Sequence, residues 1–438
     1  MGKTKRILAL LLAVVMVLGL AACSKPSSEP ADNASTPAVT EEPQKEITIN
    51  FPSIWVGKDS KATIMAELIA KFNEENAGKI KVVVEEIGDY QAYRDKMRTN
   101  ITTGNVPDIF TFDNASETQL FFRSDKLMDL TPYLNEGWRD SFIESAIKGV
   151  EFNGKIVTLP FEFGVTPVWY NMNLLEKAGV TELPKTYTEF FAMCDKLKAA
   201  GITPMSQMTG ENAWTSMLWY SQLVVGIGGP DVYKNGFDDP AFLEAAKMMQ
   251  QMYKYTTKDA VGAGAGVSAG HWINERTAIF MNGPWFVGRL KKEGVNNMYD
   301  AVKVAPAPLY EGGKGKEGGY IGFVQAYIGA AKQTDKAKEQ AVVTFLKYLT
   351  NPENVKKVSM ASGALFVVKV DLGTGSDVEK LQAQMIEQSA AAPYVVPHFQ
   401  GSVKPAVASE FPQALSALIL GEKTPEQFIE QLKRADSM

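Results

Sequence analysis

An alternation of strand-like and helix-like patterns between residues 47 and 112 constrains the fold of this chain more than any other feature. Residues 47–51 alternate between apolar and polar types, as in a half-buried strand. Apolar residues at helical spacing follow, and strand-like runs at 80–84 and 108–112 are separated by a second helical segment that ends at Gly104. This β-α-β-α-β order predicts a parallel, doubly wound α/β sheet.

The same topology predicts where a ligand would bind, because ligands of open α/β sheets lie beyond the carboxyl ends of the strands. The loop after the first strand contains Trp55, and the loop after the third strand begins with Asp113 and Asn114. An indole ring can stack on the C–H face of a sugar, and carboxylate and amide groups can bond to its hydroxyls. We therefore expect both loops to face one crevice. The competing interpretations are a core tryptophan and an Asx turn.

The N-terminus has the layout of an export signal. Three basic residues precede an apolar stretch, Ile7 to Leu18, that is too short to span a bilayer comfortably. The next residues, Leu20-Ala21-Ala22-Cys23, closely resemble the lipobox of bacterial lipoproteins, in which the cysteine receives a diacylglyceryl group and becomes the new N-terminus. We expect a signal peptide over 1–22, lipidation at Cys23, and a location outside the cytoplasm on the bacterial cell membrane.

The segment 23–46 is predicted to be a disordered tether, since it contains four prolines and no aromatic residue. The chain carries 45 Lys and Arg against 50 Asp and Glu, a net charge of −5, which disfavours nucleic acid as a partner. Only two cysteines are present, Cys23 and Cys194. Lipidation of Cys23 would leave no disulfide, and Cys194 lies on the apolar stripe of a predicted helix, where we expect a core residue.

A series of motifs along nearly all of the mature chain resembles the extracellular solute-binding proteins of ABC importers, in the branch with maltose- and multiple-sugar-binding lipoproteins. Each motif is weak alone, but their order and spacing together are specific. One departure is Arg276 to Ile279, where many relatives have Gly-Lys-Ala-Ala-Met. The motifs are Pro107 to Phe110, Leu159-Pro160 through Trp169-Tyr170-Asn171, Pro184 to Glu189, Ala278 through Asn282-Gly283-Pro284-Trp285, Phe345 to Thr350 with Pro352-Glu353, and Thr424-Pro425-Glu426.

The resemblance implies a periplasmic-binding-protein-like fold, in which two α/β lobes with doubly wound sheets enclose a ligand cleft. Because several crossings join such lobes, each lobe is discontinuous in sequence. The implied segments are 47–162 and 310–362 for lobe 1, and 163–309 and 363–438 for lobe 2.

The resemblance also implies the function. The protein would bind a sugar, expected to be an oligosaccharide, and deliver it to the transmembrane permease of an ABC importer that has separate ATPase subunits. We expect a monomer that is not an enzyme and that uses no cofactor and no metal. The alternatives are a secreted glycosidase, for which Asp113 and Glu162 could supply two carboxyl groups, and a binding protein for a solute other than a sugar.

The motifs of the family carry six further candidates for the sugar site. Glu162 lies at the first crossing, and Trp285 lies on a Gly-Pro-Trp turn where relatives commonly stack a sugar. The others are Trp214, Phe323, Gln325 and His398, the last of which could equally be a surface histidine. Together with Trp55, Asp113 and Asn114, these residues form the expected ligand site.

Other enzymatic motifs are weak. Gly266 to Gly270 fits the G-x-S-x-G pattern of a nucleophile elbow, which requires a buried strand directly before it. Residues 260–265 are rich in Ala and Gly and predict no such strand, and a triad would have to recruit His398 to Ser268. The sequence contains no zinc or EF-hand spacing.

Overall fold

We describe a computed structural model of the chain. It describes residues 45–113, 121–372 and 378–437, so the expectations for the signal peptide, Cys23, most of the tether and Asn114 lie outside the described residues.

The expected β-α-β-α-β order is confirmed in the first part of the chain. The strands β1 (Ile47–Ser53) and β2 (Ile80–Glu86) pair in parallel, with Ile47 opposite Ile80. The helices α1 (Ala62–Glu75) and α2 (Tyr90–Thr103) precede β2 and β3 (Ile109–Phe112), respectively. The carboxylate of Asp108 accepts a hydrogen bond from the backbone N–H of Asn50 at 2.9 Å, which ties the start of β3 to β1.

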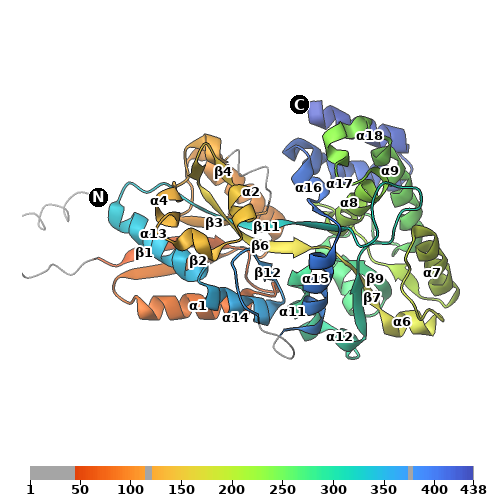
Figure 1. Cartoon of the computed structure of the whole chain (residues 1–438), viewed down its shortest axis with the longest axis horizontal. Coiled ribbons are helices and arrows are strands. Elements are labelled where there is room, and N and C mark those ends of the chain that lie inside the picture. The colour runs from red at the N-terminus through yellow and green to blue at the C-terminus, as the bar shows by residue number, and fades with distance from the viewer. Residues whose placement is uncertain (1–44, 114–120, 373–377, 438) are drawn as a thin grey trace, which may run out of the picture. The chain divides into compact units, whose positions relative to one another are not determined.

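Two long antiparallel strands, β6 (Thr158–Val165) and β11 (Tyr320–Ala330), run side by side through the middle of the fold (Figure 1). They belong to a sheet of order β12-β6-β11-β13, in which β3 also pairs with β11 in antiparallel fashion. The small outer strands are β12 (Leu365–Phe366) and β13 (Val395–Val396). The sheet is therefore mixed, and β3 meets it from the first part of the chain.

A separate four-stranded sheet of order β10-β7-β9-β8 forms the centre of the second part (Figure 1). Its strands are β7 (Val168–Asn171), β8 (Thr203–Met205), β9 (Thr277–Met281) and β10 (Val302–Ala305). At the start of helix α7 (Tyr187–Ala199), the N-cap Thr186 accepts through Oγ1 from the N–H of Glu189, and Glu189 Oε2 accepts from the N–H of Lys185, the residue before the N-cap.

The remaining elements complete the two parts. Around the first lie α4 (Thr131–Leu134), η1 (Trp138–Ser141), α5 (Glu144–Lys148), β4 (Glu151–Phe152), β5 (Lys155–Ile156), α13 (Lys336–Leu349) and α14 (Pro352–Ser362). Those of the second are α6 (Met172–Lys177), α7 (Tyr187–Ala199), α8 (Trp214–Gly228), η2 (Val232–Asp238), α9 (Pro240–Met252), η3 (Tyr253–Tyr255), α10 (Ala265–Ile273), η4 (Pro284–Phe286), α11 (Val287–Glu293), α12 (Met298–Ala301), α15 (Lys380–Ala391), α16 (Phe399–Ser402), α17 (Pro405–Ile419) and α18 (Pro425–Ser437).

Buried apolar residues form two large cores. The first core takes its members from 49–161 and 326–368, and the second core takes them from 168–281, 321–323 and 399–435. A smaller cluster around Trp169 and Trp272 packs beside the sheet of the second part. Cys194 is fully buried in the second core, which confirms the expectation that it is a core residue.

The chain passes between the cores within β11 rather than before it. Tyr310 still packs against the second core, whereas Ala326 and Tyr327 belong to the first. Val367 and Val368 also lie in the first core. These positions differ from the lobe limits expected at 309/310 and 362/363, because the uninterrupted strand pattern of β11 gives no local sign of the passage.

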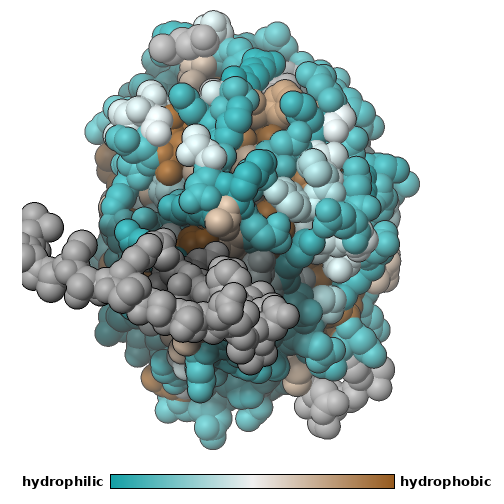
Figure 2. All heavy atoms as spheres, turned by 90° about the vertical axis from the view of Figure 1, so that its left-hand side faces the viewer, coloured by the Kyte–Doolittle hydropathy of each residue, from teal (hydrophilic) through white to brown (hydrophobic). Residues whose placement is uncertain are grey.

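The outer surface of the first part is mainly polar. Figure 2 shows mostly hydrophilic residues on this face, with apolar ones scattered among them. Exposed large apolar side chains of this part include Val83 and Ile143, which are each 42% exposed. Scattered single residues of this kind are ordinary for a protein surface.

Candidate functional site

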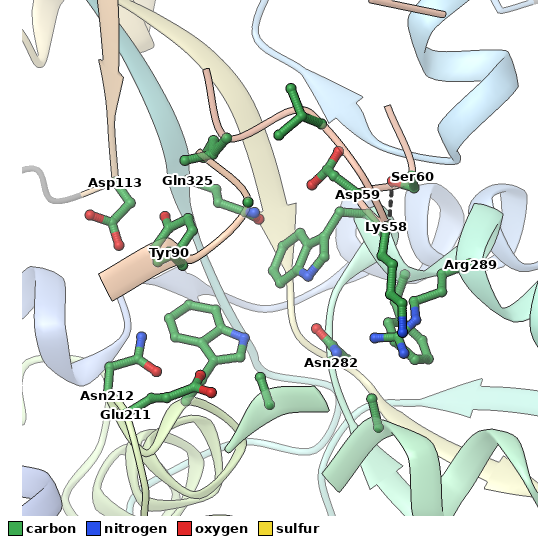
Figure 3. A pocket seen from close by; sticks show the side chains of 18 of the residues that line it. Lys58, Asp59, Ser60, Tyr90, Asp113, Glu211, Asn212, Asn282, Arg289 and Gln325 are labelled. Atoms are coloured by element: carbon green, nitrogen blue, oxygen red, sulfur yellow. Dashed lines mark hydrogen bonds between the residues drawn. The ribbon is translucent and has the colours of Figure 1, made fainter. Parts of the chain in front are cut away.

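A cavity of about 330 Å³ lies between the two cores (Figure 3). Residues of the first part reach it from the loops after β1, β2 and β3, as expected for carboxyl ends of strands in an α/β sheet. Residues of the second part reach it from the start of α8, from α10 and from the segment 282–289. Its lining consists of Ile54, Val56, Lys58, Asp59, Ser60, Gly88, Tyr90, Asp113, Glu211, Asn212, Trp214, Ala265, Ala269, Asn282, Trp285, Phe286, Arg289, Phe323 and Gln325.

Three aromatic side chains form one wall of this pocket. The ring centroids of Trp214 and Trp285 are 6.1 Å apart, and Phe323 lies 5.9 Å from Trp214 and 6.3 Å from Trp285. Trp285 packs against all three apolar clusters, so its ring lies where they meet. We refer to Trp214, Trp285 and Phe323 as the aromatic wall.

The position of Trp285 depends on two glycines. A Cβ atom at Gly164 would lie 2.4 Å from Cζ3 of Trp285, and a Cβ atom at Gly283 would lie 2.2 Å from its ring. Contacts this short do not occur between real atoms, so only glycine lets the indole lie directly on the backbone of β6. The Gly-Pro-Trp turn and the crossing strand therefore fix the ring together.

A β-bulge places Gln325 at the pocket. The register of β6 with β11 shifts between Val324 and Ala326, which leaves Gln325 without a partner residue on β6. Such an extra residue re-aims a side chain, here toward the cavity. Oε1 of Gln325 is buried and has no hydrogen-bond partner among the described residues.

At one end of the pocket, Asp113 is held by residues from both parts. Its Oδ1 lies 3.6 Å from Nε of Arg94 on α2, and its Oδ2 accepts from Nε2 of Gln400 on α16 at 3.4 Å. A second polar contact joins the parts at the opposite end, where Ser60 Oγ donates to the carbonyl of Trp285 at 2.8 Å. Polar bonds between the two parts thus flank the cavity.

Behind Asp59, Lys61 is buried between two carboxylates. Nζ of Lys61 lies 3.3 Å from Asp59 Oδ1 and 3.5 Å from Glu162 Oε2. Burial raises the pKa of Glu162 to about 7, although the positive charge of Lys61 opposes this shift. Asp59 lines the pocket, whereas Glu162 does not.

The loop that carries Glu211 and Asn212 has an unusual backbone. Glu211 and Ala213 have φ values of 53° and 52°, in the left-handed region that residues with a Cβ seldom adopt. The strained loop precedes α8 and directs Glu211 and Asn212 to the side of the pocket shared with Asp113 and Tyr90 (Figure 3). Strain of this kind is common at ligand sites.

Five of the nine expected site residues line this pocket: Asp113, Trp214, Trp285, Phe323 and Gln325. Asn114 lies outside the described residues. Trp55 is only 2% exposed and packs in the first core against Phe51 and Phe161, with ring centroids 6.2 and 5.5 Å away.

Glu162 and His398 are also placed behind the pocket instead of in it. Glu162 is 1% exposed and forms the ion pair with Lys61, so the carboxyl pair considered for a glycosidase does not meet in the cavity. His398 is 2% exposed and stacks on the rear of Phe323 at 3.8 Å, with Trp214 at 5.5 Å. Neither of its ring nitrogens has a hydrogen-bond partner among the described residues, and burial lowers its pKa to about 3.

The G-x-S-x-G segment does not form a nucleophile elbow. Ser268 is buried within α10, and its hydroxyl lies 3.1 Å from that of Ser206. The other histidine, His271, pairs with Asp259 at 2.8 Å. Among the residues that the structure describes, no cluster of three or more His, Cys, Asp or Glu side chains could hold a metal ion. In the same residues, no helix has the length and apolar character needed to cross a membrane.

Sequence reasoning missed the pocket residues that follow the expected ones along the chain. Lys58, Asp59 and Ser60 lie three to five residues after Trp55 in the loop that follows β1, and Asn212 comes two residues before Trp214. Their polar character was a usable signal, because strand-end loops place several consecutive residues at the same edge. Tyr90 follows the end of β2, so the same rule applied to it, and Asn282 stands in the motif that carries Trp285. Arg289 carried no comparable signal.

Comparisons with known proteins agree with this architecture. The family model for bacterial extracellular solute-binding proteins matches residues 57–356. The maltodextrin-binding protein MdxE of Bacillus subtilis is 25% identical over 333 residues, which cover 71% of this chain and 72% of that protein. The diacetylchitobiose binding protein DasA of Streptomyces coelicolor is 29% identical over 243 residues, or 53% of this chain and 51% of that protein. A solved structure described as a chitin oligosaccharide binding protein has a TM-score of 0.81 and 24% identity, and the match covers 90% of this chain and 98% of that chain.

Proposed function

We propose that this protein binds a sugar in the pocket between its two parts and delivers it to an ABC importer. The chain belongs to the family of bacterial extracellular solute-binding proteins. The family is extracytoplasmic, and relatives of this chain include a maltodextrin-binding and a diacetylchitobiose-binding protein. An oligosaccharide is the expected ligand.

The aromatic wall is the observation that carries this proposal. Trp214, Trp285 and Phe323 supply apolar faces on which the C–H face of a sugar ring can stack. Around them, Asp113, Asn282 and Gln325, with Glu211 and Asn212, supply acceptors and donors for hydroxyl groups. A cavity with this mixture suits a sugar better than a fully apolar or a fully charged solute.

The mechanism is closure without chemistry. A ligand drives closure only if it binds the closed form more tightly than the open form, which requires contacts to both parts. Asp113 and Asp59 come from the first part, and Trp285 and Glu211 come from the second. The loaded, closed protein would then dock as a monomer on the permease, and the separate ATPase subunits would supply the energy.

We further propose lobe limits that follow the packing. Lobe 1 would hold 47–163 and 325–369, and lobe 2 would hold 164–324 and 380–437, with the passages inside β6, inside β11 and beyond residue 369. This division revises the limits expected from the sequence and keeps each apolar core within one lobe.

We also propose that Cys23 is lipidated and that the following tether holds the protein at the membrane. The support is the Leu20-Ala21-Ala22-Cys23 sequence after a short apolar run. Two or more acyl chains would give stable anchoring, whereas a single chain binds only marginally.

A binding screen tests the proposed function. Titration calorimetry with mono- and oligosaccharides should give saturable heat with a subset of them, and small-angle scattering should show a smaller radius of gyration in the complex. Chromatography of the recovered sugar distinguishes a receptor from a glycosidase, because a receptor returns it intact. Cleaved sugar, or no binding by any sugar, would contradict the proposal.

A further inference from the structure

The charged groups of the pocket are divided between its two ends. Figure 3 shows Lys58 and Arg289 on one side, and Asp113 and Glu211 on the other. Asp113 and Lys58 come from the first part, and Glu211 and Arg289 come from the second. Asp59 also lies at the end with Lys58 and Arg289 but is paired with Lys61, and Arg94 lies beside Asp113 at the other end. Apart from these groups, each end brings together like charges from the two parts.

The two cations at the first end are incompletely neutralised. Lys58 is exposed and makes no hydrogen bond or ion pair with any residue of the described part of the chain. Arg289 donates from Nε to Glu293 Oε2 at 3.0 Å, and its guanidinium group lies over the ring of Phe286 at 5.7 Å. The terminal nitrogens of Arg289 make no hydrogen bond with the described residues, so they remain available beside Lys58.

The nearest carboxylate on the same loop is already in use. Asp59 pairs with the buried Lys61 at 3.3 Å, and the backbone N–H of Lys61 also donates to Asp59 Oδ1 at 2.8 Å. The second carboxylate near Lys61, that of Glu162, is partly protonated near neutral pH because burial raises its pKa to about 7. Asp59 is therefore directed toward Lys61 and forms no ion pair with Lys58.

There is room for a ligand group beyond these cations. A second cavity of about 510 Å³ shares Lys58, Asp59, Ser60 and Arg289 with the pocket. It continues between α1 and α14 on one side and α11 on the other. Lys58 and Arg289 thus line both spaces.

We propose that the natural solute is an acidic sugar, whose carboxylate or sulfate group binds between Lys58 and Arg289. This inference rests on the proposed function and specifies its ligand class. A neutral hydroxyl can accept a bond from either cation, but it leaves the charge of Lys58 without a partner and that of Arg289 paired only through Nε with Glu293. An anionic group compensates both and forms charge-assisted hydrogen bonds, which are stronger than neutral ones. The planar fork of Arg289 matches a carboxylate or a sulfate oxygen pair.

Matched pairs of sugars test the proposal by titration calorimetry on the purified full chain. Each pair has a neutral and an acidic member of equal length, such as galactobiose with digalacturonate, cellobiose with cellobiouronate, and lactose with its sulfate ester. In at least one pair the acidic member should bind about 10- to 100-fold more tightly, the gain expected for one charge-assisted bond. The sulfate and uronate arms show which anion is preferred.

Variants then locate the effect. Lys58→Met and Arg289→Met should each weaken binding of the acidic sugar by at least about tenfold more than they weaken binding of its neutral partner, which loses at most a bond to a neutral hydroxyl. Lys58 is exposed and makes no hydrogen bond or ion pair with a described residue, so this variant should fold normally. Lys81→Met, at an exposed position of β2, removes the same charge away from the pocket and should change neither affinity.

The outcomes separate the two proposals. If neutral members bind as tightly as acidic members, or if Lys58→Met weakens both equally, the acidic-sugar proposal is wrong while the proposed sugar-binding function stands. If no member of any pair binds, both proposals fail.

Discussion

Replacing Trp285 with alanine should weaken sugar binding about 30-fold. The indole packs against the backbone at Gly164 and also lines the pocket, so it can offer a face to a ligand. One face of an indole is roughly 80 Å² of apolar surface, which at about 25 cal/mol per Å² is worth about 2 kcal/mol, or about 30-fold in Kd. Titration calorimetry with a sugar that binds the unmodified protein measures this loss directly.

A second substitution tests whether binding depends on the position of the Trp285 ring and not only on its presence. Gly164→Ala keeps the indole but puts a Cβ atom 2.4 Å from Cζ3 of Trp285, so the ring must move. Affinity should fall in the same direction as in Trp285→Ala. Trp272→Phe is the control, because Trp272 is fully buried away from the pocket and its replacement should lower the melting temperature without changing Kd. An unchanged Kd in both Trp285→Ala and Gly164→Ala would refute the stacking argument.

Three further predictions concern titration and anchoring. Burial raises the pKa of Glu162 to about 7 from an ordinary value of 4.5, so the contribution of Glu162 to stability is lost as pH rises through about 7. Glu162→Gln should flatten this decline in the free energy of unfolding, measured with urea between pH 4.5 and 8. An unchanged slope would contradict the burial argument. The pH dependence from His398 is the reverse, because burial lowers its pKa from 6.5 to about 3, so stability is lost as pH falls below 6.5. His398→Phe should reduce this loss and should not lower the melting temperature at pH 7.5, since it removes two ring nitrogens that have no partner among the described residues. A large drop in melting temperature at pH 7.5 would show that one of these nitrogens has a partner. Cys23→Ser should release the protein from the membrane in cell fractionation with sugar affinity unchanged, and retention at the membrane would exclude the lipid anchor.

The sequence was most informative where a local pattern has a local structural consequence. Alternation and helical spacing predicted the strands and helices from 47 to 112. The expectation that ligands bind beyond the carboxyl ends of the strands correctly predicted that the loop after β1 and Asp113 face one cavity. This expectation could not say which side chains of the loop turn outward. Trp55 packs against Phe161 in the core, while its neighbours Ile54 and Val56 line the pocket.

Contacts between distant segments left no trace in the sequence. The bond between Lys61 and Glu162 joins residues 101 positions apart, and nothing near Glu162 indicates that its carboxylate turns to a buried lysine. The histidine at 398 was expected in the site, and its actual position behind Phe323 follows from the packing of α8, β11 and α16. Such positions are set by tertiary packing, which local propensity does not encode.

The pairing of β6 with β11 also bears on how the chain folds. Thr158 pairs with Gly329, and the first core is closed by α13 and by residues as far along as Val368. Native pairings over such separations have a high contact order, which slows folding because a long loop must close before the contacts form. During synthesis, the apolar strands β1, β3 and β6 emerge early but must wait for β11, α13 and β12. The segment made first is therefore among the last to be completed, and for that interval its unpaired strand edges are open to aggregation unless another protein holds them.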